Sequence, residues 1–512
     1  MALTKTEKNY LPQVIPAFGP LREELREKGQ FWTPQWLANA MAKWVTANHP
    51  EVLFDPAVGP GTFFSAARSV GFKGDFAGFE LDGTALEGAY KRGLNFSEMK
   101  GIQIGDFIQD KIRNEYPAII SNPPYIRHHR LNLQQKLELR QLATNFLGFP
   151  LDGRMGLHIY FLLKSLRQLA SNGRLAFLLP ADVCEGVSST ALWKKISEHF
   201  RIDAVINFDN AAAPFPSLDT NVILFLISNR SPAPLVVWSH LLAPKTEAVL
   251  DGVYARNSQL SVTHKRDIFE LLATGLSRPP RINITNSVPL SAFARVMRGI
   301  ATGANNFFFL TSDQVQQFDI NKNYFKRAIG RTRDCRKDKL ELADLRKLDN
   351  AGRPTWLLNI GKQRAEDLPA SLRKYIEMGE RWGLHQKPLI KTRRPWYRME
   401  QRIVPGILFA YLGRRDCRFI ENTAEALPLT GFLCIYPWDP GVEHRQKLCR
   451  ALNHPLTIAN LVFVGKSYGK GAIKVEPRRL DALEIPCEVL EEIGLKPIKS
   501  HIQPILLEKT RR

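Results

Sequence analysis

Between residues 52 and 227 the chain alternates short runs of β-branched and aromatic residues with longer segments whose apolar residues recur at helical spacing. The short runs predict seven strands, at 52–54, 76–79, 102–104, 118–120, 174–179, 204–208 and 221–227. Helices are predicted after Gly61 and at 157–170 and 189–200. Because strands that alternate with helices usually pair in parallel, this pattern predicts an α/β domain with a mostly parallel sheet.

The chain is too long for a single hydrophobic core, since 512 residues indicate roughly two to four domains. The segment 228–234, SNRSPAP, interrupts the alternation of strands and helices and is rich in turn residues. We therefore expect a first domain at residues 1–240 and a second at 241–512. The second domain shows no regular alternation, so a mixed α+β fold is predicted for it.

Positive charge is concentrated in the second domain. The whole chain has a net charge of +21, and residues 1–240 hold 25 Lys and Arg against 22 Asp and Glu. Residues 241–512 hold 46 Lys and Arg against 28 Asp and Glu, a net charge of +18. This asymmetry favours a polyanion as partner of the second domain, although a basic surface that maintains solubility is the alternative.

Three segments of the second domain combine cations with aromatic residues or glycine, at 298–309, 391–398 and 465–479. Lys and Arg bind phosphates whatever the sequence, while Arg, Asn and Gln can read base edges. Each segment alone is equally compatible with a solvated loop. The candidate nucleic-acid contacts are Arg298, Arg393, Arg394, Lys466 and Lys470.

The six cysteines include no C-x-x-C pair and no Cys/His spacing that suits zinc. They indicate free thiols in a reducing compartment, and no metal is expected. The N-terminal sequence lacks the features of a secretory signal, and no apolar run approaches the roughly 18 residues of a membrane span. We therefore expect a cytoplasmic protein without a membrane segment.

Polar residues and glycines follow the first three predicted strands, where ligands bind in open α/β sheets. Gly59 and Gly61, after the first strand, allow a tight turn and a close approach of the backbone to a ligand. Glu80, after the second strand, can accept hydrogen bonds from both hydroxyls of a ribose. Asp106 and Phe107, after the third, suit an amine and a purine ring. Singly they also fit structural turns and solvated charges, but their order favours a nucleoside site.

The fourth predicted strand ends in Ser121-Asn122-Pro123-Pro124-Tyr125, or SNPPY. Two consecutive prolines stiffen the chain and have no N–H groups, so nearby carbonyl oxygens remain free to accept hydrogen bonds. Asn122 adds a side-chain carbonyl and Tyr125 a flat ring. The stretch therefore suits a planar group that carries an NH₂, and the alternative is an incidental proline turn.

In this order, the motifs resemble those of the gamma-class adenine-specific DNA methyltransferases of restriction-modification systems. These enzymes use S-adenosylmethionine and carry [DNS]-P-P-[YFW]. The resemblance covers about residues 30–230 and includes FWTP at 31–34, the segment 157–170 and the segment 211–227. It implies a Rossmann-like methyltransferase domain with a mostly parallel seven-stranded sheet, followed by a DNA-recognition domain.

The resemblance also implies roles for individual residues. Those expected to bind the cofactor are Thr33 (carboxylate), Asp55 (methionine moiety), Gly59 and Gly61 (turn), Glu80 (ribose), and Asp106 with Phe107 (adenine). Those expected to act on the target base are Asn122, Pro123, Pro124 and Tyr125, with Phe215 packing on the base opposite Tyr125.

The chemistry implied is direct methyl transfer to N6 of adenine, whose lone pair is delocalised into the ring. If Asn122 and the Pro123 carbonyl accept the two amine protons, the lone pair can turn toward the methyl group. The base must leave the duplex, and stacking on Tyr125 and Phe215 can recover roughly 1 to 3 kcal/mol per contact. The expected partners are double-stranded DNA and a separately acting restriction endonuclease, and a monomer is expected.

Two other functions remain open from the sequence. Methyltransferases that act on protein glutamine or on RNA also carry NPPY, although they have no evident use for a large basic domain or for Phe215. A specificity subunit that only binds DNA would not need the residues that fill every expected cofactor position. No convincing P-D…(D/E)-x-K nuclease motif is found.

Overall fold

The computed structural model describes residues 31–111, 114–153, 155–184, 187–215, 221–279, 286–410, 417–468 and 472–497. The chain divides into two compact units, Met1–Pro280 and Arg281–Arg512. This division lies after the predicted boundary at residue 240. The reason is that the segment 228–234 is a connection within the first unit, between two strands of one sheet.

The described part of the first unit contains a nine-stranded sheet with the order β3-β2-β1-β4-β5-β7-β6-β8-β9. Strands β1 to β5 pair in parallel, β7 runs antiparallel between β5 and β6, and β9 runs antiparallel to β8. The bounds are β1 (Val52–Asp55), β2 (Asp75–Glu80), β3 (Ile102–Ile104), β4 (Tyr116–Ser121), β5 (Leu169–Pro180), β6 (Arg201–Phe208), β7 (Val222–Ser228), β8 (Leu235–Leu241) and β9 (Ser261–Asp267). All seven predicted strands form, and β8 and β9 extend the predicted sheet of seven.

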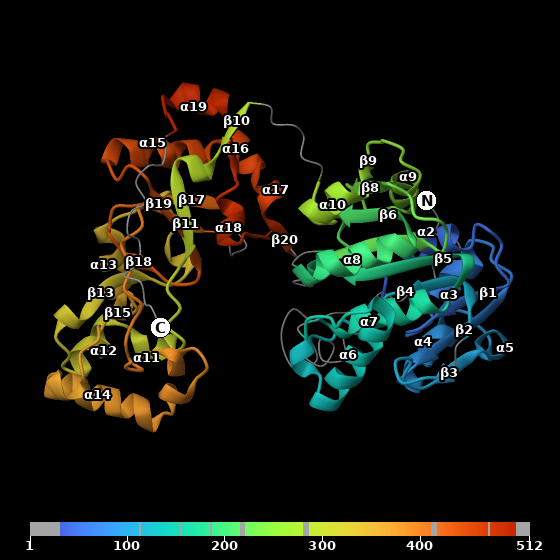
Figure 1. The fold of residues 1–512 in the computed structure, drawn as a ribbon, viewed down its shortest axis with the longest axis horizontal. Coiled ribbons are helices and arrows are strands. Elements are labelled where there is room, and N and C mark those ends of the chain that lie inside the picture. Colours follow the sequence, from blue (N-terminus) through green and yellow to red (C-terminus); the bar gives the residue numbers. More distant parts are fainter. Residues whose placement is uncertain are drawn as a thin grey trace. The chain divides into compact units, whose positions relative to one another are not determined.

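Helices cover both faces of this sheet (Figure 1). One face packs against α2 (Gln35–Val45), α3 (Thr62–Ser69) and α9 (Thr246–Val253), and the other against α6 (Leu133–Leu147), α7 (Leu157–Arg167), α8 (Val187–His199) and α10 (Ile268–Thr274). Neighbouring strand residues alternate between the two cores, as Ile119 and Ile120 do. The strands are therefore apolar on both sides, as expected for a sheet buried between two helical layers.

Two short helices of the first unit lie near the sheet edge, α4 (Glu87–Lys91) and α5 (Phe96–Met99). The helix predicted at 157–170 ends at Arg167, because Leu169 already belongs to β5. None of the helices within the described ranges is both long and apolar enough to cross a bilayer.

The second unit is mixed α+β, as predicted. Its larger sheets have the orders β11-β19-β16-β17-β14 and β12-β15-β13-β18. Its strands are β10 (Ser287–Pro289), β11 (Ala294–Arg298), β12 (Phe309–Leu310), β13 (Phe325–Ile329), β14 (Lys339–Leu340), β15 (Trp356–Leu358), β16 (Ile407–Ala410), β17 (Arg418–Asn422), β18 (Leu427–Pro428), β19 (Phe432–Pro437), β20 (Lys466–Tyr468), β21 (Ala472–Lys474) and β22 (Glu484–Pro486). Its helices are α11 (Asn305–Phe308), α12 (Ser312–Gln317), α13 (Leu342–Asn350), α14 (Ala370–Arg381), α15 (Val442–Asn453), α16 (Pro455–Ala459), α17 (Leu461–Val464), α18 (Pro477–Leu480) and α19 (Cys487–Ile493).

Candidate active site

The carboxyl ends of β1, β2 and β4 meet at one edge of the sheet, because β1 pairs in parallel with both neighbours. Asp55 is the last residue of β1 and Glu80 the last of β2, while Asn122 directly follows β4. Three of the residues selected from the sequence are thus brought together by strand pairing alone. This edge is where ligands bind in open α/β sheets.

The turn after β1 has two glycines in the left-handed region, with φ of 54° at Gly59 and 69° at Gly61. A Cβ on Gly61 would lie 2.6 Å from the Cβ of Ala89, so this glycine is needed for packing at the start of α3. A Cβ on Gly59 would meet nothing nearer than a carbonyl oxygen at 4.0 Å. The space beside Gly59 is therefore open to a ligand, and the predicted turn forms.

Glu80 supports this turn. Its Oε2 accepts a hydrogen bond from the Gly59 N–H at 2.7 Å, and its Oε1 accepts one from the Asp82 N–H at 2.9 Å. Burial raises the pKa of the Glu80 carboxyl above its usual value. Because a carboxylate oxygen can accept more than one hydrogen bond, the same two atoms retain capacity for ribose hydroxyls.

Asp55 is the most deeply buried of the acidic residues at this edge, with 1% of its surface exposed. Its Oδ1 accepts hydrogen bonds from the Ala57 N–H and from the Ser121 hydroxyl, both at 3.0 Å. Burial raises the pKa of the Asp55 carboxyl to about 7. A nearby cation would stabilise the charged form of this carboxyl, so this edge of the sheet suits a ligand with a positive charge.

The two residues predicted after β3 have different surroundings. Asp106 is partly buried, and its Oδ1 accepts a hydrogen bond from the Ile108 N–H at 2.8 Å. Phe107 is only 2% exposed, and its ring contacts those of Phe54, Phe79 and Phe161. Phe107 is thus part of the core, and its contact with an adenine ring stays a prediction.

Lys164, which was not selected from the sequence, holds the loop after β3. Its Nζ donates hydrogen bonds to the backbone carbonyls of Phe107 and Asp110 and lies 4.6 Å from the centre of the Phe107 ring. Burial lowers the pKa of the Lys164 ammonium. A lysine directly after the apolar run 159–163 of helix α7 is the signal that could have identified it.

Asn122 has one end of its amide fixed and the other free. Its Nδ2 donates hydrogen bonds to the Phe31 carbonyl at 2.6 Å and to the Thr33 hydroxyl oxygen at 3.2 Å. Its Oδ1 is buried and has no hydrogen-bond partner in the described part of the chain. A buried acceptor without a donor costs about 1–3 kcal/mol, so this oxygen is suited to a donor from a ligand.

Aromatic side chains surround the SNPPY stretch. The Phe31 ring lies 6.2 Å, centre to centre, from the rings of both Tyr125 and Phe215. The edge of His158 packs on Tyr125, with ring centres 5.8 Å apart and an interplanar angle of 83°. Burial raises the pKa of Tyr125 well above its usual value. The structure thus brings Tyr125 and Phe215 together around Phe31, whose role the sequence did not indicate.

Ser121 and Phe31 are also missing from the sequence-based selection. Ser121 bonds to Asp55, and the Phe31 carbonyl binds the Asn122 amide. Each is the first residue of a motif that was recognised, FWTP and SNPPY, although neither was assigned a role. The Phe31 contact uses a backbone atom, so no property of its side chain could have revealed it.

The candidate DNA contacts of the second unit fall into three groups. Arg393 donates hydrogen bonds to the carbonyls of Ala301 and Thr302, both at 2.8 Å, so its guanidinium holds a loop. Arg394 is exposed, and Arg298 is half-exposed and lies 3.4 Å from the Glu400 carboxylate. The Lys466 side chain and the whole of Lys470 lie outside the described residues.

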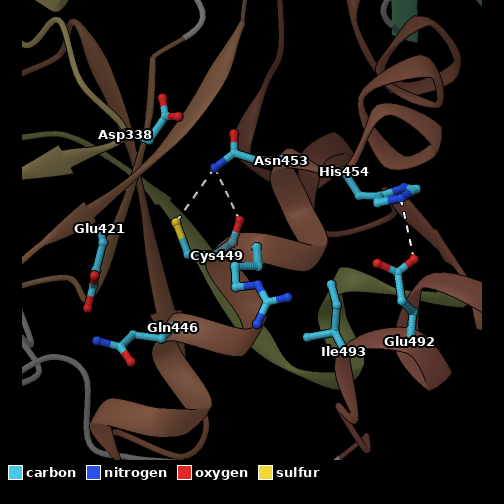
Figure 2. Close-up of a pocket in the computed structure, with 9 residues that line it drawn as sticks. Asp338, Glu421, Gln446, Cys449, Asn453, His454, Glu492 and Ile493 are labelled. Atoms are coloured by element: carbon cyan, nitrogen blue, oxygen red, sulfur yellow. Dashed lines mark hydrogen bonds and ion pairs between the residues drawn. The ribbon is translucent and has the colours of Figure 1, made fainter.

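The second unit contains a cavity of about 490 Å³, shown in Figure 2. It is lined by Asp338, Glu421, Gln446, Cys449, Arg450, Asn453, His454, Glu492 and Ile493. His454 pairs with Glu492 across 3.7 Å, and Glu421 pairs with Arg445 across 3.1 Å. Three of the nine lining residues are acidic, against one arginine and one histidine, so the charge of the lining does not favour a phosphate.

Each unit matches a model of a known protein family. Residues 21–238 match the family model "N-6 DNA Methylase", and residues 281–509 match the model "Type II methyltransferase M.Eco57I, C-terminal domain". The chain is 28% identical over 479 residues to the Type II methyltransferase M.AccI of Acinetobacter calcoaceticus, covering 90% of this chain and 85% of that protein. It is 23% identical over 486 residues to M.XamI of Xanthomonas campestris pv. amaranthicola, covering 92% and 87%.

Among solved structures, the Type IIL restriction-modification enzyme MmeI in complex with DNA aligns with a TM-score of 0.50 and 12% identity. The alignment covers 91% of this chain and 63% of MmeI, so this chain spans less than two thirds of that enzyme. The likeness to MmeI concerns the fold.

Proposed function

Because this chain belongs to the N-6 adenine DNA methyltransferases, which use S-adenosylmethionine as methyl donor, we propose that the SNPPY stretch carries the transfer. Asn122 Oδ1 and the backbone carbonyl of Pro123 accept the two protons of the adenine amine. The lone pair of N6 then turns toward the methyl group, and Pro124 keeps the turn rigid. The observation that carries this proposal is the buried, unpartnered Oδ1 of Asn122, whose amide nitrogen is already bound at 2.6 Å and 3.2 Å.

The cofactor lies, in this proposal, along the edge formed by the first three strands. The open space at Gly59 lets the cofactor approach the protein backbone, and Asp55 faces the cationic end of the cofactor. Glu80 accepts hydrogen bonds from the hydroxyls of its ribose. Asp106 takes the adenine amine, while Gly61 holds the turn in place. The groups that would contact the cofactor are oxygen atoms that accept hydrogen bonds, and one of them belongs to a buried carboxylate. This arrangement suits a nucleoside with a positive charge.

The substrate is duplex DNA, since the second unit matches a Type II methyltransferase domain and residues 281–512 hold 41 Lys and Arg against 24 Asp and Glu. The target adenine leaves the helix to reach Asn122, and Tyr125 and Phe215 contact the extruded base. Arg298, Arg394, Lys466 and Lys470 are candidate phosphate or base contacts. A protein-glutamine or RNA substrate is not favoured, because residues 21–238 match the N-6 DNA Methylase family model.

The proposal extends to the cellular setting. Relatives named as Type II methyltransferases indicate the modification function of a restriction-modification system. We propose that a separate endonuclease recognises the same site, that the protein acts as a monomer, and that it acts in the cytoplasm, where its DNA lies. Transfer by the groups named above requires no metal.

The test is expression in a host that lacks DNA methylation, followed by mapping of modified adenines by single-molecule sequencing. Asn122→Ala should abolish adenine modification while calorimetry still detects cofactor binding. Asn145→Ala, at an exposed position on α6, is the matched control and should modify DNA like the wild type. Wild-type levels of modification by Asn122→Ala would overturn the proposed role of the amide.

A further inference from the structure

The Thr33 hydroxyl is one of two groups that fix the Asn122 amide. Thr33 is only 3% exposed, and its Oγ1 accepts from Asn122 Nδ2 at 3.2 Å. A hydroxyl carries one proton and two acceptor positions. Because Oγ1 is an acceptor in this contact, its proton is left to be donated, and no acceptor for it is found in the described part of the chain.

The backbone position of Thr33 is fixed by the fold. Thr33 precedes α2, in which Pro34 is the N-cap residue, and this helix buries Leu37, Ala38, Ala40, Met41, Ala42, Trp44 and Val45. The neighbouring carbonyl of Phe31 holds the other proton of the same amide at 2.6 Å. A change in the direction of the Thr33 hydroxyl therefore acts on Asn122 and not on the position of the helix.

We propose that Thr33 is a positioning residue that couples the cofactor site to the base site. The hydroxyl donates its proton to the carboxylate of the bound cofactor and accepts from Asn122 Nδ2 with its oxygen. Donation increases the negative charge on Oγ1 and strengthens its hold on Nδ2. Occupancy by the cofactor thereby holds the amide more tightly in the direction it already has, with Oδ1 toward the adenine amine. This inference rests on the function proposed above.

Coupling of this kind is reciprocal. The factor by which the cofactor carboxylate raises the affinity for the adenine amine should equal the factor by which the adenine amine raises the affinity for the cofactor. The group responsible is the amino-acid end of the cofactor. An analogue that keeps the adenosine and the sulfur but lacks the amino-acid end should bind the first unit without producing the effect.

The experiment measures recognition of the amine directly. Two labelled duplexes carry the mapped target site, one with adenine and one with purine, which lacks the 6-amino group, at the target position. Their dissociation constants are measured by fluorescence anisotropy with no cofactor, with S-adenosylhomocysteine, and with 5′-methylthioadenosine. In the wild type, S-adenosylhomocysteine should raise the preference for adenine over purine by about fivefold or more, the lower end of typical coupling. 5′-Methylthioadenosine should leave it unchanged.

Variants separate the hydroxyl from the packing of Thr33. Thr33→Val keeps the branched shape and should bind both duplexes, but its preference for adenine should not respond to S-adenosylhomocysteine. Thr33→Ser restores the hydroxyl and should restore the response. An equal response by Thr33→Val and the wild type, or an equal effect of the two cofactor analogues on the wild type, would overturn the inference.

The outcomes distinguish this inference from the proposed function. If the wild type prefers adenine over purine but this preference does not change with S-adenosylhomocysteine, the role of Asn122 is supported and the coupling is refuted. A wild type that shows no preference for adenine in any condition removes the role of Asn122 Oδ1 itself.

Discussion

Replacing Asp55 with Asn should make the first unit more stable at pH 8 while weakening cofactor binding. Both hydrogen bonds to Asp55 end on Oδ1, from Ala57 N–H and from the Ser121 hydroxyl. The carbonyl oxygen of an asparagine can accept both, so the network survives. The substitution removes a buried negative charge, the form that burial disfavours, and puts an amide NH₂ in place of Oδ2, which accepts neither of these two bonds.

The magnitude follows from the pKa of Asp55, which burial raises from 3.8 to about 7. A folded-state pKa above the unfolded value means that the folded state binds the proton more tightly. The free energy of unfolding therefore falls as pH rises from about 4 to about 7. At pH 8 the cost of the ionised carboxylate is at most about 4 kcal/mol, at about 1.4 kcal/mol per pKa unit.

The assay is urea unfolding of the full chain at pH 8 and pH 5, followed by hydrogen exchange in peptides from β1 and β4. Asp55→Asn should exceed the wild type in free energy of unfolding at pH 8. The difference should shrink by about 3 kcal/mol at pH 5, where the wild-type carboxyl is protonated when folded. A variant that is less stable than the wild type at pH 8, or a difference that does not change with pH, would refute the reasoning. Calorimetry should show weaker binding of S-adenosylmethionine by the variant.

Four further substitutions test other parts of the structure. Tyr125→Ala should raise the KM for DNA by roughly tenfold, a loss of about 1–3 kcal/mol of stacking, and should retain measurable turnover in a methyl-transfer assay. Lys164→Met should weaken S-adenosylmethionine binding in calorimetry, because the loop 106–110 loses the hydrogen bonds from the Lys164 ammonium. The preference for adenine over purine should remain unchanged. Arg394→Ala should weaken DNA binding and lower its salt dependence by about one counterion in anisotropy titrations. Arg393→Ala should instead lower the melting temperature, because its guanidinium holds the carbonyls of the 301–302 loop.

Much of the first unit could be predicted because its strands and turns are encoded locally. The alternation of apolar runs located all seven strands that were sought, and strand pairing then brought Asp55, Glu80 and Asn122 to one edge. The segment at 228–234 misled the boundary prediction because Pro and Ser mark a turn equally well within a sheet and between domains. Because the segment was interpreted as the end of the domain, the predicted sheet did not include β8 and β9.

The fine structure of the site was less predictable because it depends on contacts between distant segments. Asn122 is held by residues about ninety positions earlier, partly through a backbone carbonyl. Phe107 was predicted to contact a purine ring, and that contact stays a prediction, but the sequence did not indicate that its ring also packs in the core of the unit. Its contact with Phe161 comes from the neighbouring helix α7, which the motif after β3 does not include.

The fixed direction of the Asn122 amide has a consequence for which bases the site tolerates. Since Nδ2 is occupied by Phe31 and Thr33, the amide cannot turn round to offer a donor. If Asn122 Oδ1 accepts from the target amine as proposed, a base with a carbonyl oxygen in place of the amine, such as guanine or hypoxanthine, would place its oxygen against Oδ1 and be repelled. A deaminated adenine should therefore not bind at this site, even when the rest of the recognition sequence is intact.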